Sequence, residues 1–214
     1  ILMRKEKFND ALSYFKKYLI MKDRENKKPT FNLSIVDAYY YEHKAYDNIG
    51  VCYERRNLIN DAEVAYKKAI NLNNKEPQYY SNLAQLYIAQ NYIEKAEAIT
   101  TTAINMGIAN DSIYLLNGKI QSLQKKPYEA INTLKQLIHR NNKNIHACIF
   151  LINLLIQTNQ LKDAEYIAKE IISSNSDHLG LKCLIERIKF KNGDKNSAIK
   201  FINNILESNP SNGS

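Results

Sequence analysis

Apolar residues along most of this chain recur three and four positions apart, which is the spacing of one face of an α-helix. Five segments share this pattern, at residues 59–70, 93–104, 127–138, 161–172 and 195–206. Each contains an alanine at the same place, and successive alanines lie 34 residues apart: Ala62, Ala96, Ala130, Ala164 and Ala198. A fixed period of this length is typical of stacked helix pairs, so we predict that each segment is the second helix of a pair.

The first helix of each pair has a pattern of its own, which is clearest in the first copy. There Tyr46-x-x-Ile49-Gly50-x-x-Tyr53 precedes Ala62-x-x-x-Tyr66. These residues resemble the tetratricopeptide signature W-x-x-L-G-x-x-Y…A-x-x-x-F, with Tyr in the Trp and Phe positions. The resemblance implies an all-α fold, a right-handed α-solenoid of antiparallel helix pairs with about five units and one preceding helix.

The period also divides the chain. We expect a helix of an incomplete first repeat at 4–21, a basic connector at 22–33, and a repeat with an extended first helix at 34–76. Repeats follow at 77–110, 111–144 and 145–178, then a degenerate last repeat at 179–210 and a tail at 211–214.

The last repeat breaks the pattern of its first helix, because strict counting places Lys182, Glu186 and Lys189 at apolar positions. A one-residue insertion near Asn192–Gly193 would restore apolar residues there, and we therefore predict this insertion. The restored residues are Leu181, Leu184, Ile185 and Ile188.

Small residues recur where paired helices approach each other. Gly50, Gly118 and the alanine series leave room for this close approach, and a larger residue would overpack the contact at roughly 1–3 kcal/mol.

Composition agrees with a folded helical protein: 44% of the residues are hydrophobic, 24% are charged, and there are only 6 Gly and 4 Pro. The net charge of +8 is uneven, since residues 4–28 hold nine bases and four acids. This charge suggests an acidic or phosphorylated partner, but we favour the simpler explanation, a solvated basic end. The rest is nearly neutral, so we expect no nucleic-acid-binding stripe.

The three cysteines, Cys52, Cys148 and Cys183, are widely spaced, and we expect reduced, buried thiols. No apolar run is long enough to cross a bilayer, and the first residues lack the features of a signal peptide. We therefore expect no membrane insertion and a cytoplasmic location. The chain does not begin with Met, so an upstream segment or a removed signal stays open.

Catalytic motifs are missing from the sequence. It contains no G-x-x-x-x-G-K-[ST], G-x-G-x-x-G, H-E-x-x-H or G-x-S-x-G, and its four histidines are isolated. We predict that the protein is not an enzyme and that it has no cofactor and no metal site.

The predicted function is a protein–protein interaction scaffold that binds a protein or peptide segment in the groove of the solenoid. One alternative is the recognition or regulatory region of a larger enzyme or assembly. A less favoured alternative is an RNA-binding helical repeat, because the related pentatricopeptide arrays typically run at 35 residues and the spacing here is 34.

The resemblance places the first helices at the groove, and ten residues there are candidate ligand contacts. They are Asp47, Asn48, Val51, Ser81, Asn82, Gln85, Leu115, Lys119, Ile149 and Asn153. A family subtype grips a C-terminal carboxylate with a Lys/Asn/Arg clamp, but of the equivalent residues only Asn82 fits, so we do not expect that ligand in the groove.

Asn48 and Asn82 occupy equivalent positions and resemble the start of an asparagine ladder, in which side-chain amides hold a peptide backbone. The next two equivalents are Leu116 and Phe150. We therefore expect a ligand with a polar extended part against Asn48, Ser81, Asn82 and Gln85, and an apolar part against Leu115, Lys119, Ile149 and Asn153. The simpler alternative is that the asparagines are solvated and that Leu116 and Phe150 pack between repeats.

The predicted helix at 4–21 lacks a pair partner, because 51 residues separate Ala11 from Ala62 instead of 34. Its apolar face must then be covered by upstream sequence, by a ligand or by a neighbouring chain, and the last case would be self-association.

Overall fold

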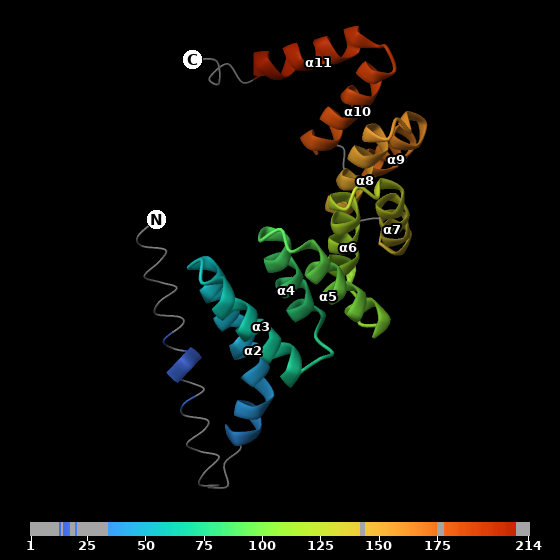
Figure 1. The fold of residues 1–214 in the computed structure, drawn as a ribbon. Helices are drawn as coiled ribbons and strands as arrows, with labels where there is room; N and C mark the ends of the chain where they lie inside the picture. The colour runs from blue at the N-terminus through green and yellow to red at the C-terminus, as the bar shows by residue number, and fades with distance from the viewer. Residues whose placement is uncertain are drawn as a thin grey trace. The chain divides into compact units, whose positions relative to one another are not determined.

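Ten α-helices, α2 to α11, make up most of the part of the chain that the computed structural model describes (Figure 1). That part comprises Ser13, residues 15–17, Ile20, and residues 34–141, 144–174 and 178–208. The helices are α2 (Ser34–Arg55), α3 (Ile59–Leu72), α4 (Pro77–Ala89), α5 (Ile93–Asn105), α6 (Asp111–Leu123), α7 (Pro127–Arg140), α8 (Ile145–Gln157), α9 (Leu161–Ser174), α10 (Leu179–Lys191) and α11 (Lys195–Ser208). The prediction of an all-α repeat of helix pairs is confirmed.

The 34-residue period of the sequence is also the period of the backbone. Helices α4, α6, α8 and α10 begin at residues 77, 111, 145 and 179, and the second helices begin at 59, 93, 127, 161 and 195. Each second helix therefore begins at the first residue of its predicted segment. Helix α2 is longer than the other first helices and begins at Ser34.

The turn inside each pair uses a residue with positive φ. These residues are again 34 apart: Asn57 (60°), Asn91 (59°), Lys125 (60°), Asn159 (59°) and Gly193 (100°). Asparagine and glycine tolerate the left-handed region better than other residues, and one residue in this conformation lets the chain leave the first helix and reverse.

The predicted insertion in the last repeat is wrong. Helices α10 and α11 begin 16 residues apart, as α8 and α9 do, and Gly193 keeps the turn in register with Asn159. The buried residues of α10, Leu181, Leu184 and Ile188, stand at the same repeat positions as the buried Ile113, Leu116 and Ile120 of α6. What distinguishes α10 is that Lys182, Glu186 and Lys189 lie at positions where α8 buries Cys148, Ile152 and Leu155.

Two of these polar residues form a network with α11. The Ser197 hydroxyl donates to Glu186 Oε2 at 2.8 Å, and Lys189 Nζ donates to Glu186 Oε1 at 2.7 Å. Cys183 of α10 is exposed, whereas Cys52 and Cys148 are buried. The prediction of buried thiols is therefore wrong for Cys183.

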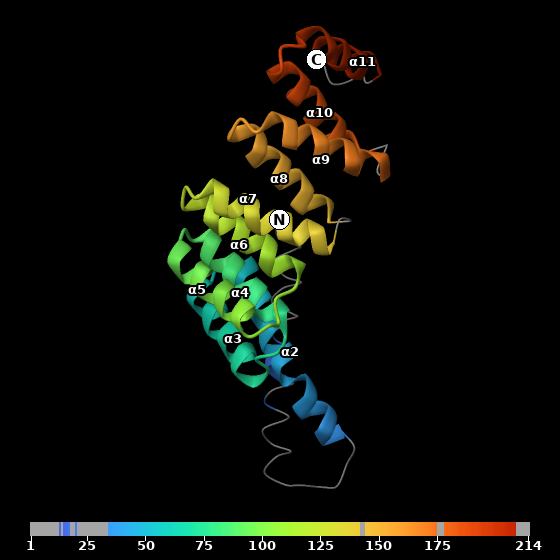
Figure 2. The same cartoon turned by 90° about the vertical axis from the view of Figure 1, so that its right-hand side faces the viewer.

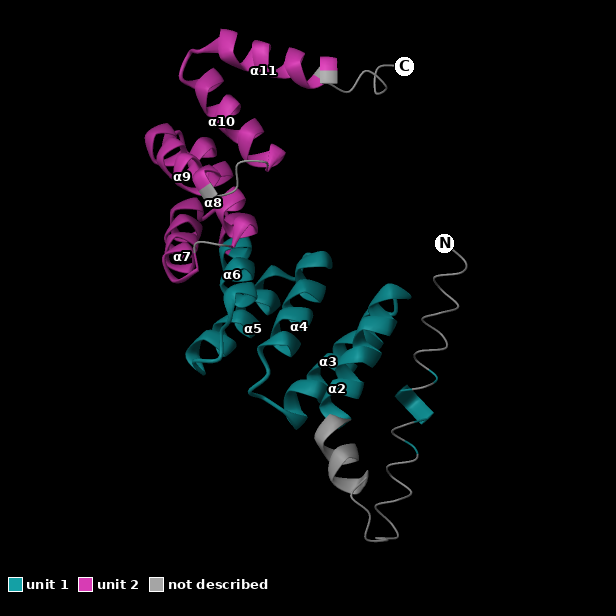
Figure 3. Cartoon of the chain, turned by 180° about the vertical axis from the view of Figure 1, so that it is seen from behind, with its two compact units in different colours: residues 1–120 teal, residues 121–214 magenta. Residues whose placement is uncertain are grey.

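Two compact units divide the chain, Ile1–Ile120 and Gln121–Ser214 (Figure 3). In unit 1, α3 packs against both α2 and α4, and α4 packs against α5 (Figure 2). In unit 2, α8 contacts α7, α9 and α10. Consecutive first helices therefore touch in each unit, as the contacts between α2 and α4 and between α8 and α10 show.

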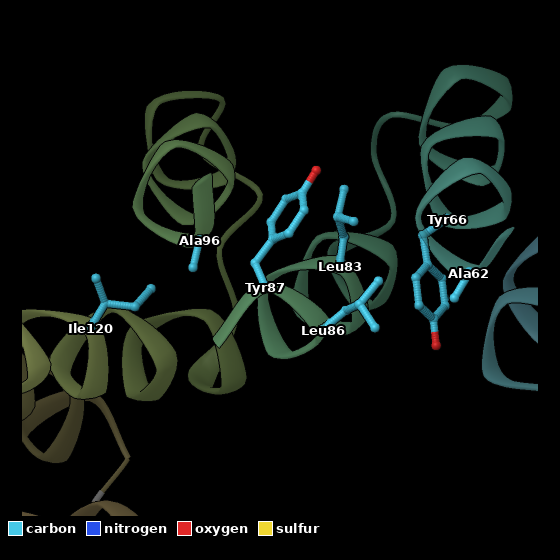
Figure 4. Packing of buried hydrophobic residues seen from close by; sticks show 7 residues of the cluster. All are labelled: Ala62, Tyr66, Leu83, Leu86, Tyr87, Ala96 and Ile120. Atoms are coloured by element: carbon cyan, nitrogen blue, oxygen red, sulfur yellow. The ribbon is translucent and has the colours of Figure 1, made fainter. Parts of the chain in front are cut away.

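Small residues bring the helices together, as predicted. Ala62, Ala96, Ala130 and Ala164 are fully buried. Figure 4 shows Leu83, Leu86 and Tyr87 of α4 between Tyr66 on one side and Ala96 on the other. A Cβ atom on Gly50 would lie 2.5 Å from Cε1 of Tyr66, so the tyrosine ring occupies the space that glycine leaves.

The N-terminal helix predicted at 4–21 is described only at Ser13, residues 15–17 and Ile20, which are helical. Phe15 packs against a cluster of Ile49, Cys52 and Ala65. The predicted connector at 22–33 and the tail at 211–214 lie outside the described residues.

Candidate functional site

A chain of side-chain hydrogen bonds joins the first helices α2 and α4. Asn82 Nδ2 donates to Asp47 Oδ1 at 2.8 Å, and Gln78 Nε2 donates to Asn82 Oδ1 at 2.7 Å. Gln78, Asn82 and Gln85 lie four and three residues apart and share one face of α4. We call the surface formed by Asp47, Asn48, Gln78, Asn82 and Gln85 the amide face.

Asp47 is the acidic group of the amide face, and it is only partly exposed. Burial raises the pKa of its carboxyl group, the hydrogen bond from Asn82 opposes this rise, and the charge of Glu76 adds to it. Burial together with Asp47 and Glu76 also raises the pKa of Tyr79 to about 12, and the hydroxyl of Tyr79 is hydrogen-bonded to Nδ1 of His43. Tyr79 is therefore neutral at physiological pH.

Three predicted contacts on α2 and α4 that take no part in these hydrogen bonds are accessible to a ligand. Asn48 and Gln85 are exposed, and Val51 is half-buried. Asn48 and Gln85 present side-chain amides, which both donate and accept hydrogen bonds.

The prediction that Ser81 contacts a ligand is wrong. Its side chain is fully buried, and its hydroxyl donates to the carbonyl of Pro77 at 3.2 Å, one turn back in the same helix. The position equivalent to Asp47 therefore points into the core in α4, because the helix turns Tyr80, Ser81 and Ala84 inward together.

The structure also changes the role expected of Asn82. Both ends of its amide already have partners, Asp47 and Gln78, so Asn82 holds the two helices together. Asn48 is the exposed member of the pair.

The remaining candidates are divided between α6 and α8. On α6, Leu115 is half-buried and Lys119 is exposed. On α8, Ile149 and Asn153 are half-buried. Asn153 Nδ2 donates to the carbonyl of Ile149 at 2.9 Å, and its Oδ1 accepts from Nη1 of Arg187 on α10 at 3.0 Å.

Sequence reasoning missed two residues, Gln78 and Arg187. Gln78 lies one helical turn before Asn82, a spacing at which two amides can pair, and Arg187 follows Asn153 by one repeat length. Both spacings were visible in the sequence, and a search for polar partners at four and 34 residues would have found them.

Two further observations concern other kinds of chemistry. Burial raises the pKa of the Cys148 thiol to about 11, so this thiol stays protonated at neutral pH. Among the described residues, no cluster of three or more His, Cys, Asp and Glu side chains could hold a metal ion, and no helix has the length and apolar character that crossing a membrane requires.

Comparisons with known proteins identify the repeat. Family models described as tetratricopeptide repeat match residues 43–76, 77–106 and 123–181, together more than half of the chain. No curated protein has a sequence that matches this chain.

Solved structures similar to the chain include PilW, PilF and YrrB. PilW, a type IV pilus biogenesis factor, superposes with a TM-score of 0.69 at 16% identity over 96% of this chain and 95% of its own. PilF of Pseudomonas aeruginosa gives a TM-score of 0.67 at 14% identity over 96% and 95%. YrrB, described as having an unusual peptide-binding site, gives 0.61 at 15% identity over 78% and 87%. At these identities the likeness concerns the fold alone.

Proposed function

The chain belongs to the tetratricopeptide repeat family, and from this premise we propose that it is a non-catalytic scaffold whose amide face binds an extended segment of a partner protein. Repeats of this family form protein–protein interaction scaffolds, so the general role follows from membership. The proposal adds the place of binding.

The observation that carries the proposal is the hydrogen bond between Asp47 and Asn82. It fixes α2 and α4 side by side at the point where Asn48, Gln78 and Gln85 are exposed. Groups that are already held in place lose little conformational entropy when a ligand binds. An extended peptide has unpaired N–H and C=O groups along its length, and exposed amides satisfy both kinds.

Unit 2 has a different surface, which we treat as a second region of contact with the partner protein. Ile149 and Phe150 of α8 are half-buried apolar residues beside Asn153. We propose that this surface binds apolar side chains of a partner, with the Asn153 and Arg187 pair as its polar border.

A selected peptide tests the amide face. Peptides from a random displayed library are selected on the full chain, and their affinities are measured by fluorescence anisotropy for the chain and two double variants. Asn48→Ala with Gln85→Ala removes two exposed amides of the face. Thr101→Ala with Asn105→Ala is the matched control, because it removes two exposed polar side chains from α5.

The expected result is roughly tenfold weaker binding by the first variant, which corresponds to about one lost hydrogen bond, and less than about twofold change in the control. Equal affinity of all three proteins for every selected peptide would reject the amide face as the binding site. Thermal melts of the three proteins should coincide, because all four replaced side chains are exposed.

A further inference from the structure

A cavity of about 390 Å³ lies between α2 and α3, away from the amide face. Its size is within the range of pockets that hold small ligands or single side chains. Its described lining residues belong to α2 and α3, together with Lys16 of the N-terminal segment. We call it the lysine cavity.

The lysine cavity has an apolar floor. Ile49 of α2 and Ala65 of α3 line it, and both belong to the buried cluster that Phe15 covers. Tyr46 and Tyr53 are three residues before and four residues after Ile49, so the three side chains form one stripe along α2. Two amphipathic rings and an aliphatic floor suit an apolar side chain.

The ammonium groups of two lysines lie over the tyrosine rings that line this cavity. Lys16 Nζ lies 5.3 Å from the centroid of the Tyr53 ring, and Lys68 Nζ lies 5.9 Å from that of the Tyr46 ring. A cation held over a ring keeps its full charge, because the ring is neutral. Among the described lining residues Asp61 is the one acid, beside Lys16 and Lys68, so their charges have a positive balance.

The surrounding sequence has the same sign of charge. Residues 4–28, which include Lys16, contain nine bases and four acids. A positive, partly apolar cavity raises the local concentration of anionic ligands and favours those with an apolar group.

We propose that the lysine cavity is a second binding site, which takes an acidic peptide segment of a partner protein with an apolar side chain between carboxylates. The apolar side chain occupies the floor formed by Ile49 and Ala65. The flanking carboxylates pair with the ammonium groups of Lys16 and Lys68. This site is independent of the amide face, since it uses the stripe of Tyr46, Ile49 and Tyr53 on α2, whereas the amide face uses Asp47 and Asn48.

The probe is a fluorescein-labelled peptide, Ser-Asp-Glu-Leu-Glu-Asp-Ser, with anisotropy as the readout on the full chain. A second peptide replaces Leu by Ser, and a third replaces every acid by its amide. Lys16→Glu with Lys68→Glu reverses the two charges of the cavity. Lys17→Glu with Lys67→Glu is the matched control, because it makes the same change in net charge at the neighbouring lysines, which are exposed and lie outside the lining.

We expect roughly tenfold weaker binding after Lys16→Glu with Lys68→Glu, and less than about threefold weakening in the control. The Leu-to-Ser peptide and the amide peptide should each bind at least about fivefold more weakly to the unaltered chain. If the Lys16→Glu and Lys68→Glu protein melts early, Lys16→Gln with Lys68→Gln takes its place and should still weaken binding at least about threefold.

Three results would overturn the proposal. The first is equal weakening in both double variants, which would mean attraction to net charge alone. The second is equal affinity for the Leu and Ser peptides, which would leave the cavity floor unused. The third is self-association of the chain in sedimentation that Lys16→Glu with Lys68→Glu abolishes, because a second copy would then be the occupant. None of these three results tests the amide face. The lysine cavity can therefore be rejected while the proposed function still stands.

Discussion

Helix α4 of unit 1 and helix α8 of unit 2 start two repeat lengths apart and have the same number of residues, yet they expose different chemistry. Where α4 has the half-buried Asn82, α8 has the half-buried Phe150. The inner faces of the two helices are alike, because Leu86 and Leu154 lie at equivalent positions and both are buried. The repeat therefore fixes the backbone and the inner face, and the residues at the remaining positions decide which ligand chemistry each unit offers.

The largest expected effect tests whether the two inner faces are equivalent. Leu86→Ala and Leu154→Ala each remove a buried side chain, so each should lower the free energy of unfolding by roughly 2–5 kcal/mol. The two losses, measured by urea denaturation, should agree within about 1 kcal/mol. A loss below about 1 kcal/mol in only one of the two variants would show that the inner faces of α4 and α8 are not equivalent.

Overpacking gives the next largest effect. Ala96 is fully buried in the cluster with Tyr87 and Ile120. Ala96→Leu should lower the free energy of unfolding by about 1–3 kcal/mol and should broaden the transition, because neighbouring pairs share their contacts. A melt that matches the unaltered chain would show that the alanine series does not mark the helix contacts.

These inner features were the part that the sequence could predict. The alanine period located the second helices, because a buried contact between helices tolerates only small side chains at that place. The same period also holds in the last repeat, where polar residues at usually apolar positions led us to expect an insertion. Helix α10 instead keeps the register, and Glu186 is paired there with Lys189 and Ser197.

The candidate site was predicted less well, for a related reason. Periodicity put Asn82 at the groove but could not show that its amide is already bonded to Asp47, 35 residues earlier. Ser81 was assigned by equivalence to Asp47, whereas its own neighbours bury it. The lysine cavity depends on Lys16, which precedes the regular repeats, so no period could relate it to α2 and α3.

A third prediction compares the polar contacts between first helices in the two units. Asn82→Ala removes two hydrogen bonds and takes away a partner of the half-buried Asp47, so it should cost about 1–2 kcal/mol. Arg187→Ala removes an exposed contact with Asn153 and should cost less than about 0.5 kcal/mol. Equal costs would mean that the polar link between α2 and α4 is no more structural than that between α8 and α10.

The smallest effect concerns the charge of Asp47. Its pKa is raised above the ordinary value of 3.8 in the folded chain, so the folded state binds the proton more tightly than the unfolded state does. Stability from this group is therefore present below the unfolded pKa and is lost as the pH rises through the folded pKa. Asp47→Asn keeps an oxygen for Asn82 and removes the charge.

This variant should raise the melting temperature slightly at pH 7. The gain should vanish at pH 3, where Asp47 is protonated in both states. Melts at the two pH values measure it, and Asp61→Asn, at an exposed acid on α3, serves as the control. A lower melting temperature of Asp47→Asn at pH 7 would mean that the carboxylate stabilises the contact between α2 and α4 more than its burial opposes it.

The difference between the polar and apolar first helices matters for function only if the partner contacts the amide face, and crosslinking tests this directly. A photoreactive benzoylphenylalanine is placed at position 85 of α4 or at position 101 of α5, both exposed, and each full chain is irradiated with a selected peptide. Our account predicts that mass spectrometry finds the peptide attached at position 85 and little at position 101. Attachment at position 101 with none at position 85 would contradict it.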